Sequence, residues 1–188
     1  MINISKNKCI GCGLCIIKCP VKAISINELG FAVIDKQKCI NCGMCLKTCP
    51  QKAVMDIKEK LIFAIGTDDK KTIKADDHVG MSKYYSMWEY SNGDMTFKGE
   101  RENIKYKEDE SIIHGDPEKA KKVISVLAGV DAIVGKMLGP NIVQLKVEFI
   151  PIVVREKYIK KAIKVIKENI NEMIEEKNKK ERTGIILK

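Results

Sequence analysis

Short apolar runs separated by polar segments recur along most of the chain, and their spacing predicts strands and helices in turn. The continuous apolar run at residues 61–66 predicts a buried strand. Residues 83–90 and 95–101 flank an Asn-Gly dipeptide and predict a β-hairpin with its turn at 91–94. Residues 131–135 and 149–154 predict two further buried strands.

Three segments between and after these strands predict helices. Asp116 and Pro117 are typical of a helix start, because aspartate caps free N–H groups and proline suits the first turn. This helix is expected to run to Leu127 and to end at Gly129. A short helix is expected from Pro140. Apolar residues at every third or fourth position predict a last helix over 156–177. Strands alternating with helices predict an α/β domain.

The first 58 residues follow another pattern, a repeat with a period of thirty. KCIGCGLCIIKCPVKAI begins at Lys8 and KCINCGMCLKTCPQKAV begins at Lys38. Each half predicts a loop, a short helix and a strand, with strands expected at 23–26, 30–34 and 53–57. The composition changes after Lys58. We therefore expect domains at 1–58 and 59–178, and a charged and apolar tail at 179–188 that packs either on the domain or on a neighbour.

All eight cysteines lie in the two copies of the repeat, each time as C-x₂-C-x₂-C-x₃-C-P. This is the ligand spacing of bacterial ferredoxins with two [4Fe-4S] clusters, which the segment resembles. Three thiolates at i, i+3 and i+6 can wrap one cubane, whereas the fourth suits the neighbouring cluster. The pattern predicts site I at Cys9, Cys12, Cys15 and Cys49, and site II at Cys19, Cys39, Cys42 and Cys45.

Disulfides and zinc are the alternatives for these cysteines. Disulfides require an oxidising compartment, and no apolar signal segment precedes the motif. Zinc sites use CxxC pairs, not a triple followed by Cys-Pro. Because about sixty residues bury little apolar surface, bound metal is expected to stabilise this domain. The side chains expected to enclose the cubanes are Ile10, Leu14, Ile16, Ile40, Met44 and Leu46.

Charge and hydropathy indicate which classes of partner to expect among proteins, nucleic acids and membranes. The chain has a formal net charge of +9, and its first 58 residues hold nine lysines against three acidic residues. Two oxidised cubanes at about −2 each would lower the net charge to about +5. We expect the lysines to face an acidic redox partner, and not nucleic acid, because no aromatic-rich basic stripe accompanies them. No run reaches the roughly eighteen apolar residues of a membrane span, so we expect a cytoplasmic protein without membrane contact.

Beyond residue 60, three segments resemble the dinitrogenase iron-molybdenum cofactor biosynthesis family. They are FAIGTDD, DHVGMSKYY and VDAIVGKMLGPNIVQL, and the resemblance extends over about residues 61–177. It implies a ribonuclease-H-like α/β domain with a mixed sheet that binds or carries an additional metal-sulfur cofactor. His78 and Gly80 match the family's histidine and glycine, and Gly135 and Gly139 match its glycine-rich turn, where Lys136 replaces a commoner glycine.

The same turn has a physical argument of its own. It follows a buried strand and precedes a helix that includes Asn141, so its N–H groups could receive an anion. His78 could ligate iron or donate a hydrogen bond to sulfide, and His114 could approach the same crevice. For both histidines the favoured alternative is an ordinary loop residue with a satisfied hydrogen bond.

Two functions therefore compete. We expect an electron carrier or electron-transfer subunit, because the cysteine ligands that this function requires can be identified one by one in the sequence. The alternative is a metallocluster carrier or assembly factor whose second domain holds a metal-sulfur cofactor. No nucleophile–base pair or carboxylate cluster indicates an enzyme. The electron donor and acceptor and the oligomeric state stay open.

Overall fold

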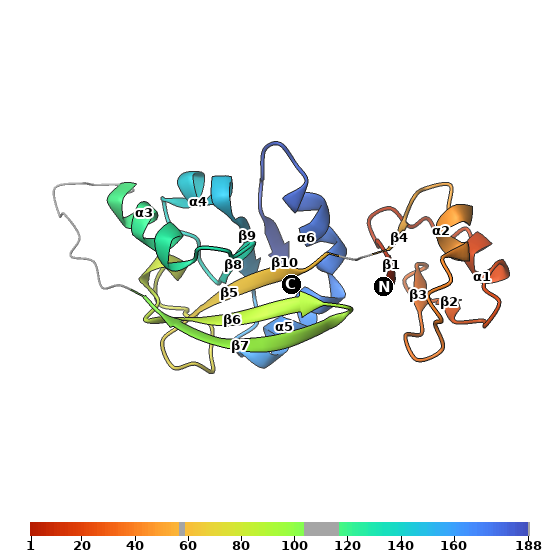
Figure 1. The fold of residues 1–188 in the computed structure, drawn as a ribbon, viewed down its shortest axis with the longest axis horizontal. Helices are drawn as coiled ribbons and strands as arrows, with labels where there is room; N and C mark the ends of the chain where they lie inside the picture. The colour runs from red at the N-terminus through yellow and green to blue at the C-terminus, as the bar shows by residue number, and fades with distance from the viewer. Residues whose placement is uncertain (57–58, 104–116, 188) are drawn as a thin grey trace. The chain divides into compact units, whose positions relative to one another are not determined.

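The computed structural model describes residues 1–56, 59–103 and 117–187. The chain forms two compact units, residues 1–58 (unit 1) and residues 59–188 (unit 2) (Figure 1). Among the described residues, no helix has the length and apolar character that a membrane crossing requires.

Unit 1 is built twice over from a strand, a short helix and a second strand. Its elements are β1 (Ile2–Ile4), α1 (Leu14–Ile17), β2 (Ile24–Ile26), β3 (Ala32–Ile34), α2 (Met44–Thr48) and β4 (Val54–Asp56). β1 pairs with β4 and β2 with β3, both antiparallel. The thirty-residue period relates β1 to β3 and β2 to β4, so the two strand pairs are equivalent.

The strands expected at 23–26, 30–34 and 53–57 are confirmed as β2, β3 and β4, while Ile57 lies outside the described residues. β1 was not predicted, because Ile2 and Ile4 alternate with a polar residue over only three positions. The repeat contained the missing signal, since β1 stands thirty residues before β3.

The core of unit 1 is small and contains the cysteines themselves. Cys15 and Cys45 are each 8% exposed. Cys9, Cys19 and Cys49 pack against the same core while half-buried. The other buried members are Ile2, Ile4, Ile24, Ala32, Ala53 and Val54. Metal ligands therefore form a large part of what this unit buries.

Unit 2 contains one mixed sheet with the strand order β10-β9-β8-β5-β6-β7 (Figure 1). The strands are β5 (Leu61–Thr67), β6 (Tyr84–Ser91), β7 (Asp94–Glu102), β8 (Ala132–Gly135), β9 (Ile150–Val154) and β10 (Ile185–Leu187). β5, β8, β9 and β10 run parallel, whereas β6 and β7 are antiparallel additions. Asn92 and Gly93, both at positive φ, form the two-residue turn of the predicted β6–β7 hairpin.

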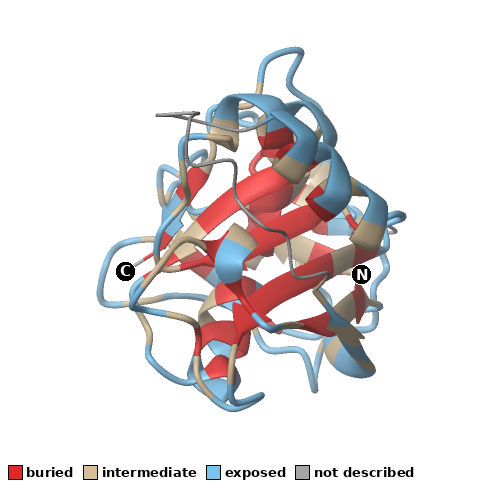
Figure 2. Cartoon of the chain, turned by 90° about the vertical axis from the view of Figure 1, so that its left-hand side faces the viewer, coloured by how far each residue is buried: buried red, intermediate tan, exposed pale blue. Residues whose placement is uncertain are grey.

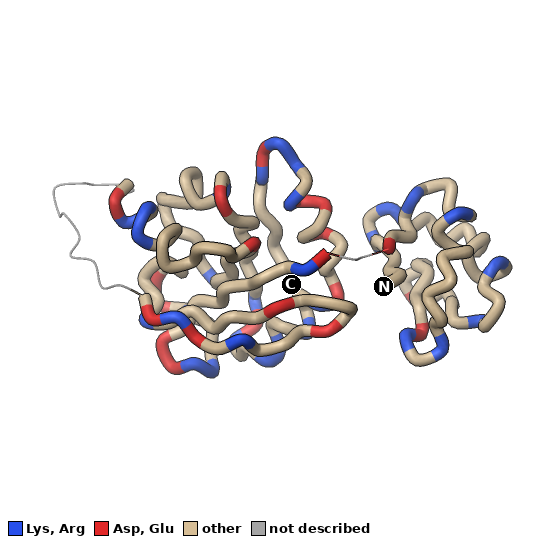
Figure 3. The backbone as a smooth tube through the Cα atoms, in the orientation of Figure 1, with Lys and Arg blue, Asp and Glu red and all other residues tan. Residues whose placement is uncertain are grey.

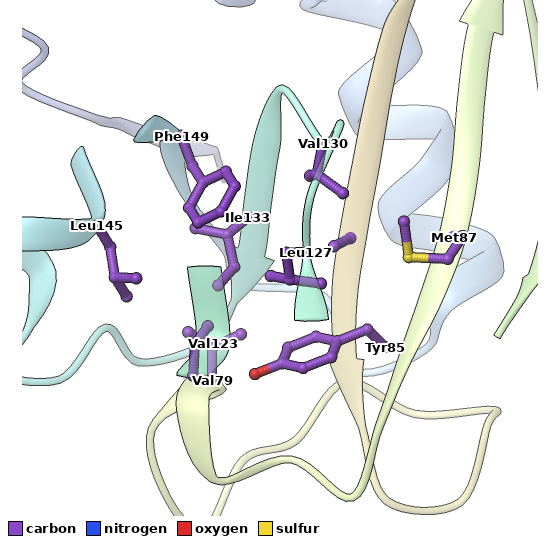
Figure 4. Close-up of a cluster of buried hydrophobic side chains, with 10 residues drawn as sticks. Val79, Tyr85, Met87, Val123, Leu127, Val130, Ile133, Leu145 and Phe149 are labelled. Carbon is purple, nitrogen blue, oxygen red and sulfur yellow. The ribbon is translucent and has the colours of Figure 1, made fainter. Parts of the chain in front are cut away.

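Helices cover both faces of this sheet, and its strands β5, β8 and β9 are largely buried, whereas β7 is mostly exposed (Figure 2). The elements are a 3₁₀ turn η1 (Val79–Met81) and α3 (Pro117–Val126), α4 (Ile142–Glu148), α5 (Ile159–Glu168) and α6 (Ile170–Lys177). Side chains of α3 and α4 meet β5, β6 and β8 in one apolar cluster (Figure 4). α5 carries Ile159, Ala162, Ile163 and Ile166 inward on the opposite face (Figure 1).

One prediction about the end of the chain was wrong, and the structure decides between two alternatives for another segment. The single helix expected over 156–177 is two helices, because Asn169 leaves the helical conformation between them at φ −109° and ψ 18°. Of the two places expected for the tail that begins at residue 179, the domain or a neighbour, the structure has the domain: residues 179–187 belong to unit 2, where β10 pairs in parallel with β9. Ile185 and Leu187 are buried there, which gives the apolar end of the chain its place in the sheet.

Candidate metal centre

Four thiols line one cavity in unit 1, and they come from both halves of the repeat. The hollow measures about 350 Å³, counting the space on its open side. Cys9, Cys12 and Cys15 enter from the loop before α1 and from α1 itself, and Cys49 comes from the end of α2. Its other walls are Ile4, Ile10, Gly13, Leu14, Ala32, Gln51, Ala53 and Val54. The predicted site I residues therefore lie together.

A second hollow of about 320 Å³ repeats this arrangement thirty residues on. Cys39, Cys42 and Cys45 surround it, and Cys19 reaches it from the first half. The remaining walls are Ile2, Pro20, Val21, Ala23, Ile24, Ile34, Ile40, Gly43 and Met44. These are the residues predicted for site II, again brought together from both halves.

The loops that carry the first three cysteines depend on left-handed backbone. Gly13 and Gly43 precede α1 and α2 at φ 76° and 75°, which glycine adopts without steric cost. Gly11 adopts φ 68°, and a Cβ there would lie 2.3 Å from the Gly30 carbonyl oxygen. Asn41, at the equivalent place in the second half, has φ 54°. This backbone lets thiols three residues apart converge.

Backbone amides donate hydrogen bonds to three of the sulfurs. The Ala23 N–H lies 3.2 Å from Cys19 Sγ, and the Ala53 N–H lies 3.3 Å from Cys49 Sγ. In both cases the preceding lysine is left-handed, which turns the next amide back toward the sulfur. A third bond joins Ala32 N–H to Cys9 Sγ at 3.4 Å. Such bonds stabilise negative charge on a thiolate or on a cluster bound to it.

Burial raises the pKa of the Cys15 thiol, with further contributions from the charges of Cys9, Cys12 and Cys45. Burial likewise raises the pKa of Cys45, and Cys39 and Cys42 add to it. Without a cation these inner thiols resist ionisation, so metal must displace their protons.

Four of the six apolar side chains expected around the cubanes do line the cavities, namely Ile10, Leu14, Ile40 and Met44. Ile16 and Leu46 do not, which corrects that prediction: they pack against the core of unit 1 instead. The reason is helical geometry, because a residue two positions after Leu14 or Met44 projects from nearly the opposite side of the helix.

The number and grouping of the thiols suit a cluster at each site. Among residues 1–56, 59–103 and 117–187, no group of three His, Cys, Asp or Glu side chains is close enough to hold one metal ion. The four thiols of each set instead border one hollow. A cubane suits this arrangement because its four irons each take one thiolate at a different corner.

In unit 2 the structure brings the predicted histidine loop and glycine-rich turn together. The Val79 N–H donates to the Met137 carbonyl oxygen at 3.0 Å. His78 packs on Gly139, where a Cβ would lie 3.0 Å from its Cγ and Cδ2. Gly135 likewise leaves room for Val79, whose Cβ would lie 2.8 Å from a Cβ at that position. His78 Nδ1 is buried and has no hydrogen-bond partner among the described residues.

The other predicted residues of unit 2 are placed less closely around His78. Gly80 follows in the η1 turn, and its carbonyl accepts a hydrogen bond from Asn103 Nδ2 at 2.9 Å. Lys136 is half-buried in the same loop as Gly139, and Asn141 precedes α4. His114 lies outside the described residues.

Sequence reasoning missed the backbone donors at Ala23, Ala32 and Ala53, because an alanine carries no chemical signature. It also missed Asn41, whose Oδ1 accepts a hydrogen bond from the Ile2 N–H at 3.1 Å. A signal for Asn41 was present, since the repeat has glycine at the equivalent position 11.

Comparison with known families agrees with the chemistry of unit 1. A family model described as 4Fe-4S dicluster domain matches residues 8–53, and a second model with the same description matches residues 31–108. The first span holds all eight cysteines, and the second holds only those from Cys39 to Cys49. No curated protein matches the chain. The N-terminal region is thus similar to iron-sulfur ferredoxin domains, which supports an electron-transfer role.

Proposed function

We propose that unit 1 binds two [4Fe-4S] clusters, one in site I and one in site II, and passes single electrons to a protein partner. The observation that carries this proposal is the grouping of four thiols around each of two hollows, with the fourth thiol of each set supplied by the other half of the repeat. Each bound cubane would supply a one-electron redox couple. We also propose that the protein works in the cytoplasm, where thiols stay reduced, and that it is not itself an enzyme.

The residues around the hollows have distinct roles in this function. The eight thiolates hold the iron, and the alanine amides at positions 23, 32 and 53 stabilise the added charge. Ile10 and Ile40 lie beside the hollows and are 66% and 62% exposed. They limit water at the clusters while leaving an apolar surface that a partner can cover.

The partner is expected to present acidic groups around an apolar contact. All eight lysines within residues 1–56 are exposed, against only three acidic residues in that span, and they lie on several sides of unit 1 (Figure 3). Opposite charge raises the rate of encounter and is screened by salt.

The primary test uses the full chain purified without oxygen. We expect about eight iron and eight sulfide per chain, and reduction by two electrons with paramagnetic signals of two interacting cubanes. Zinc in place of iron, or about four iron per chain in fully loaded protein, would contradict the proposal.

The partner charge has a separate test. The reduced full chain is mixed with an acidic and with a basic acceptor protein of similar potential. We expect faster oxidation by the acidic acceptor and a rate that falls as salt increases. A double variant Lys18→Gln, Lys47→Gln should slow this reaction, whereas Lys160→Gln, an exposed lysine of α5, should not. Equal rates with both acceptors would refute an acidic docking face.

A second function is favoured by one observation in unit 2. His78 has a buried Nδ1 without a described partner, and its ring lies on Gly139 of the glycine-rich turn. We propose as the alternative that this place in a ribonuclease-H-like domain receives a metal-sulfur cofactor, which would make the protein a cluster carrier or assembly factor. Iron clearly above eight per chain, lost in His78→Ala but kept in Lys160→Gln, would support it.

A further inference from the structure

The two halves of unit 1 can be compared bond by bond, because the period of thirty relates them. Ser5 N–H donates to the Ala53 carbonyl oxygen at 2.8 Å, and its equivalent Asp35 N–H donates to Ala23 at 2.8 Å. Cys9 N–H and Cys39 N–H each donate, at 3.0 Å, to the carbonyl four residues before. The amides of Ala23 and Ala53 both donate to a cysteine sulfur. The two halves thus agree closely in these contacts.

A hydrogen bond to a ligand sulfur breaks this equivalence. In the first site, Ala32 N–H donates to Cys9 Sγ at 3.4 Å. The equivalent donor in the second site is Ile2 N–H and the equivalent sulfur is that of Cys39. Ile2 N–H instead donates to Asn41 Oδ1 at 3.1 Å. Site I therefore has two N–H···S bonds among the described contacts, and site II has one.

The side chain at position 41 causes this difference. Its equivalent is Gly11, which has no side chain that could accept a hydrogen bond from the Ala32 amide. A larger residue could not replace Gly11, since a Cβ there would lie 2.3 Å from the Gly30 oxygen. At position 41 an asparagine is accommodated in the left-handed conformation, at φ 54°. Its Oδ1 also lies 3.9 Å from Cys39 Sγ.

Both differences lower the reduction potential expected for the cluster in site II relative to that in site I. Reduction adds one electron, and so one negative charge, to a cubane with its thiolates. An amide N–H directed at a ligand sulfur stabilises that charge and raises the potential, while a carbonyl oxygen near the sulfur destabilises it. Site II lacks one such donor and has the Asn41 oxygen in its place.

We propose that Asn41 makes the cluster in site II the lower-potential centre of the two, by accepting the Ile2 amide hydrogen that would otherwise bind Cys39 Sγ. This inference rests on the proposed function, because it requires a cubane in each site. It assigns the first electron taken up by the protein to site I.

A second asymmetry must be separated from this one. Asp35 replaces the equivalent Ser5 near site II, and its negative charge would also lower the potential there. Its carboxylate, however, accepts hydrogen bonds from the Gln37 and Lys38 amides and lies 3.3 Å from the Lys38 amine, which offset the charge. We therefore expect the effect of Asp35 to be smaller than that of Asn41.

The test is a redox titration of the full, iron-loaded chain followed by electron paramagnetic resonance, with Cys12→Ser and Cys42→Ser variants used to assign each signal to its site. In the unaltered protein, half-reduction should place the electron mainly on site I. Asn41→Gly should free the Ile2 amide and favour electron occupancy of site II about tenfold, which is about 59 mV for a one-electron couple. Asn41→Asp, which keeps the acceptor and adds charge, should not raise the site II potential.

Asn7→Gly is the matched control, because Asn7 is an exposed asparagine two residues before Cys9. It should leave both potentials unchanged, and Asp35→Ser should shift site II by less than Asn41→Gly does. The proposal is overturned if Asn41→Gly keeps its iron and leaves site II unshifted, or shifts site I instead. If Asn41→Gly loses the site II cluster, the test rests on the potentials of the two clusters in the unaltered protein. Equal potentials, or a higher potential in site II, then overturn the proposal. Iron content tests the proposed function independently of all these shifts.

Discussion

Cys19 and Cys49 each lie in the opposite half of the repeat from the three cysteines whose hollow they line. The residue pattern was enough to propose this exchange, because a fourth thiol after another helical turn cannot reach back to its own loop. Neither thiol could be assigned an amide partner from the pattern. That required the positions of Ala23 and Ala53 after left-handed lysines.

Cys19→Ala should therefore damage the cluster in site II and leave site I loaded. One of four ligands is removed, so iron should fall toward about four per chain while one cubane signal persists. Cys49→Ala is the matched variant and should damage site I. Loss of the same signal in both variants, measured by paramagnetic resonance of the reduced protein, would refute the exchange of ligands.

Asp69 shows how one carboxylate organises a loop in unit 2. Hydrogen bonds from the amides of Thr72 and Lys71, at 2.7 and 2.9 Å, lower the pKa of Asp69 to about 2. Because the pKa in the folded protein is below the ordinary value near 4, the carboxylate stabilises the fold fully above about pH 4. This contribution decreases as the pH falls from about 4 to about 2.

Asp69→Asn should consequently be less stable than the unaltered protein at pH 7, with the difference shrinking toward pH 2. Trp88 is the single tryptophan of the chain and lies in β6, so its fluorescence during denaturation reports on unit 2 even when acid releases iron from unit 1. Asp94→Asn, an exposed aspartate in the β6–β7 hairpin, is the control. A stability difference independent of pH would contradict this role.

Among the elements of unit 2, β10 depends on a side chain in the preceding helix. Glu176 of α6 accepts hydrogen bonds from the amides of Thr183 and Gly184 and pairs with Lys179. Burial acts to raise the pKa of Glu176, but Lys179 and these amides outweigh it, so the pKa is lowered. The carboxylate thus directs the chain into β10, where the sequence pattern predicted only a tail.

Glu176→Ala should release β10 from β9 and destabilise unit 2 by about 2 kcal/mol, because backbone donors lose a charged acceptor. Hydrogen exchange at residues 185–187 should accelerate most. Glu181→Ala removes an exposed glutamate from the same connection and serves as control. Unchanged exchange in Glu176→Ala would show that the β9 pairing alone holds the strand.

At the scale of the whole molecule, the two units differ in what stabilises them. Unit 2 buries continuous apolar clusters, one of which joins α3 and α4 to the sheet, with the Tyr85 hydroxyl directed toward Val79 and Val123 (Figure 4). Unit 1 includes five cysteines in or against its core. Its stability should therefore depend on bound metal, and that of unit 2 should not.

Removing iron by anaerobic chelation should unfold unit 1 and leave unit 2 intact. Far-ultraviolet circular dichroism should lose only the contribution of residues 1–58, while the denaturation midpoint reported by Trp88 stays within error of the loaded protein. Restoring iron and sulfide should restore the lost signal. A native-like circular dichroism spectrum after complete chelation would contradict the dependence on metal.

Features that depend on local spacing could be predicted from the order of the amino acids alone. These are the thirty-residue repeat, the candidate ligand sets, the β6–β7 hairpin at its Asn-Gly turn and the change of composition after Lys58. Each of these features depends on a few neighbouring positions or on a fixed period. Over such short spans, backbone geometry and residue preference determine the local structure directly.

Contacts between residues that are distant along the chain could be identified only in the folded protein. It placed β1 and β10 in their sheets, His78 on Gly139, and the Ile2 amide on Asn41, thirty-nine positions away. Such contacts depend on how whole elements pack, and neither partner carries a local signal of the other. The difference in reduction potential that we propose between the two sites therefore cannot be predicted from the cysteine positions, which are identical in both halves of the repeat.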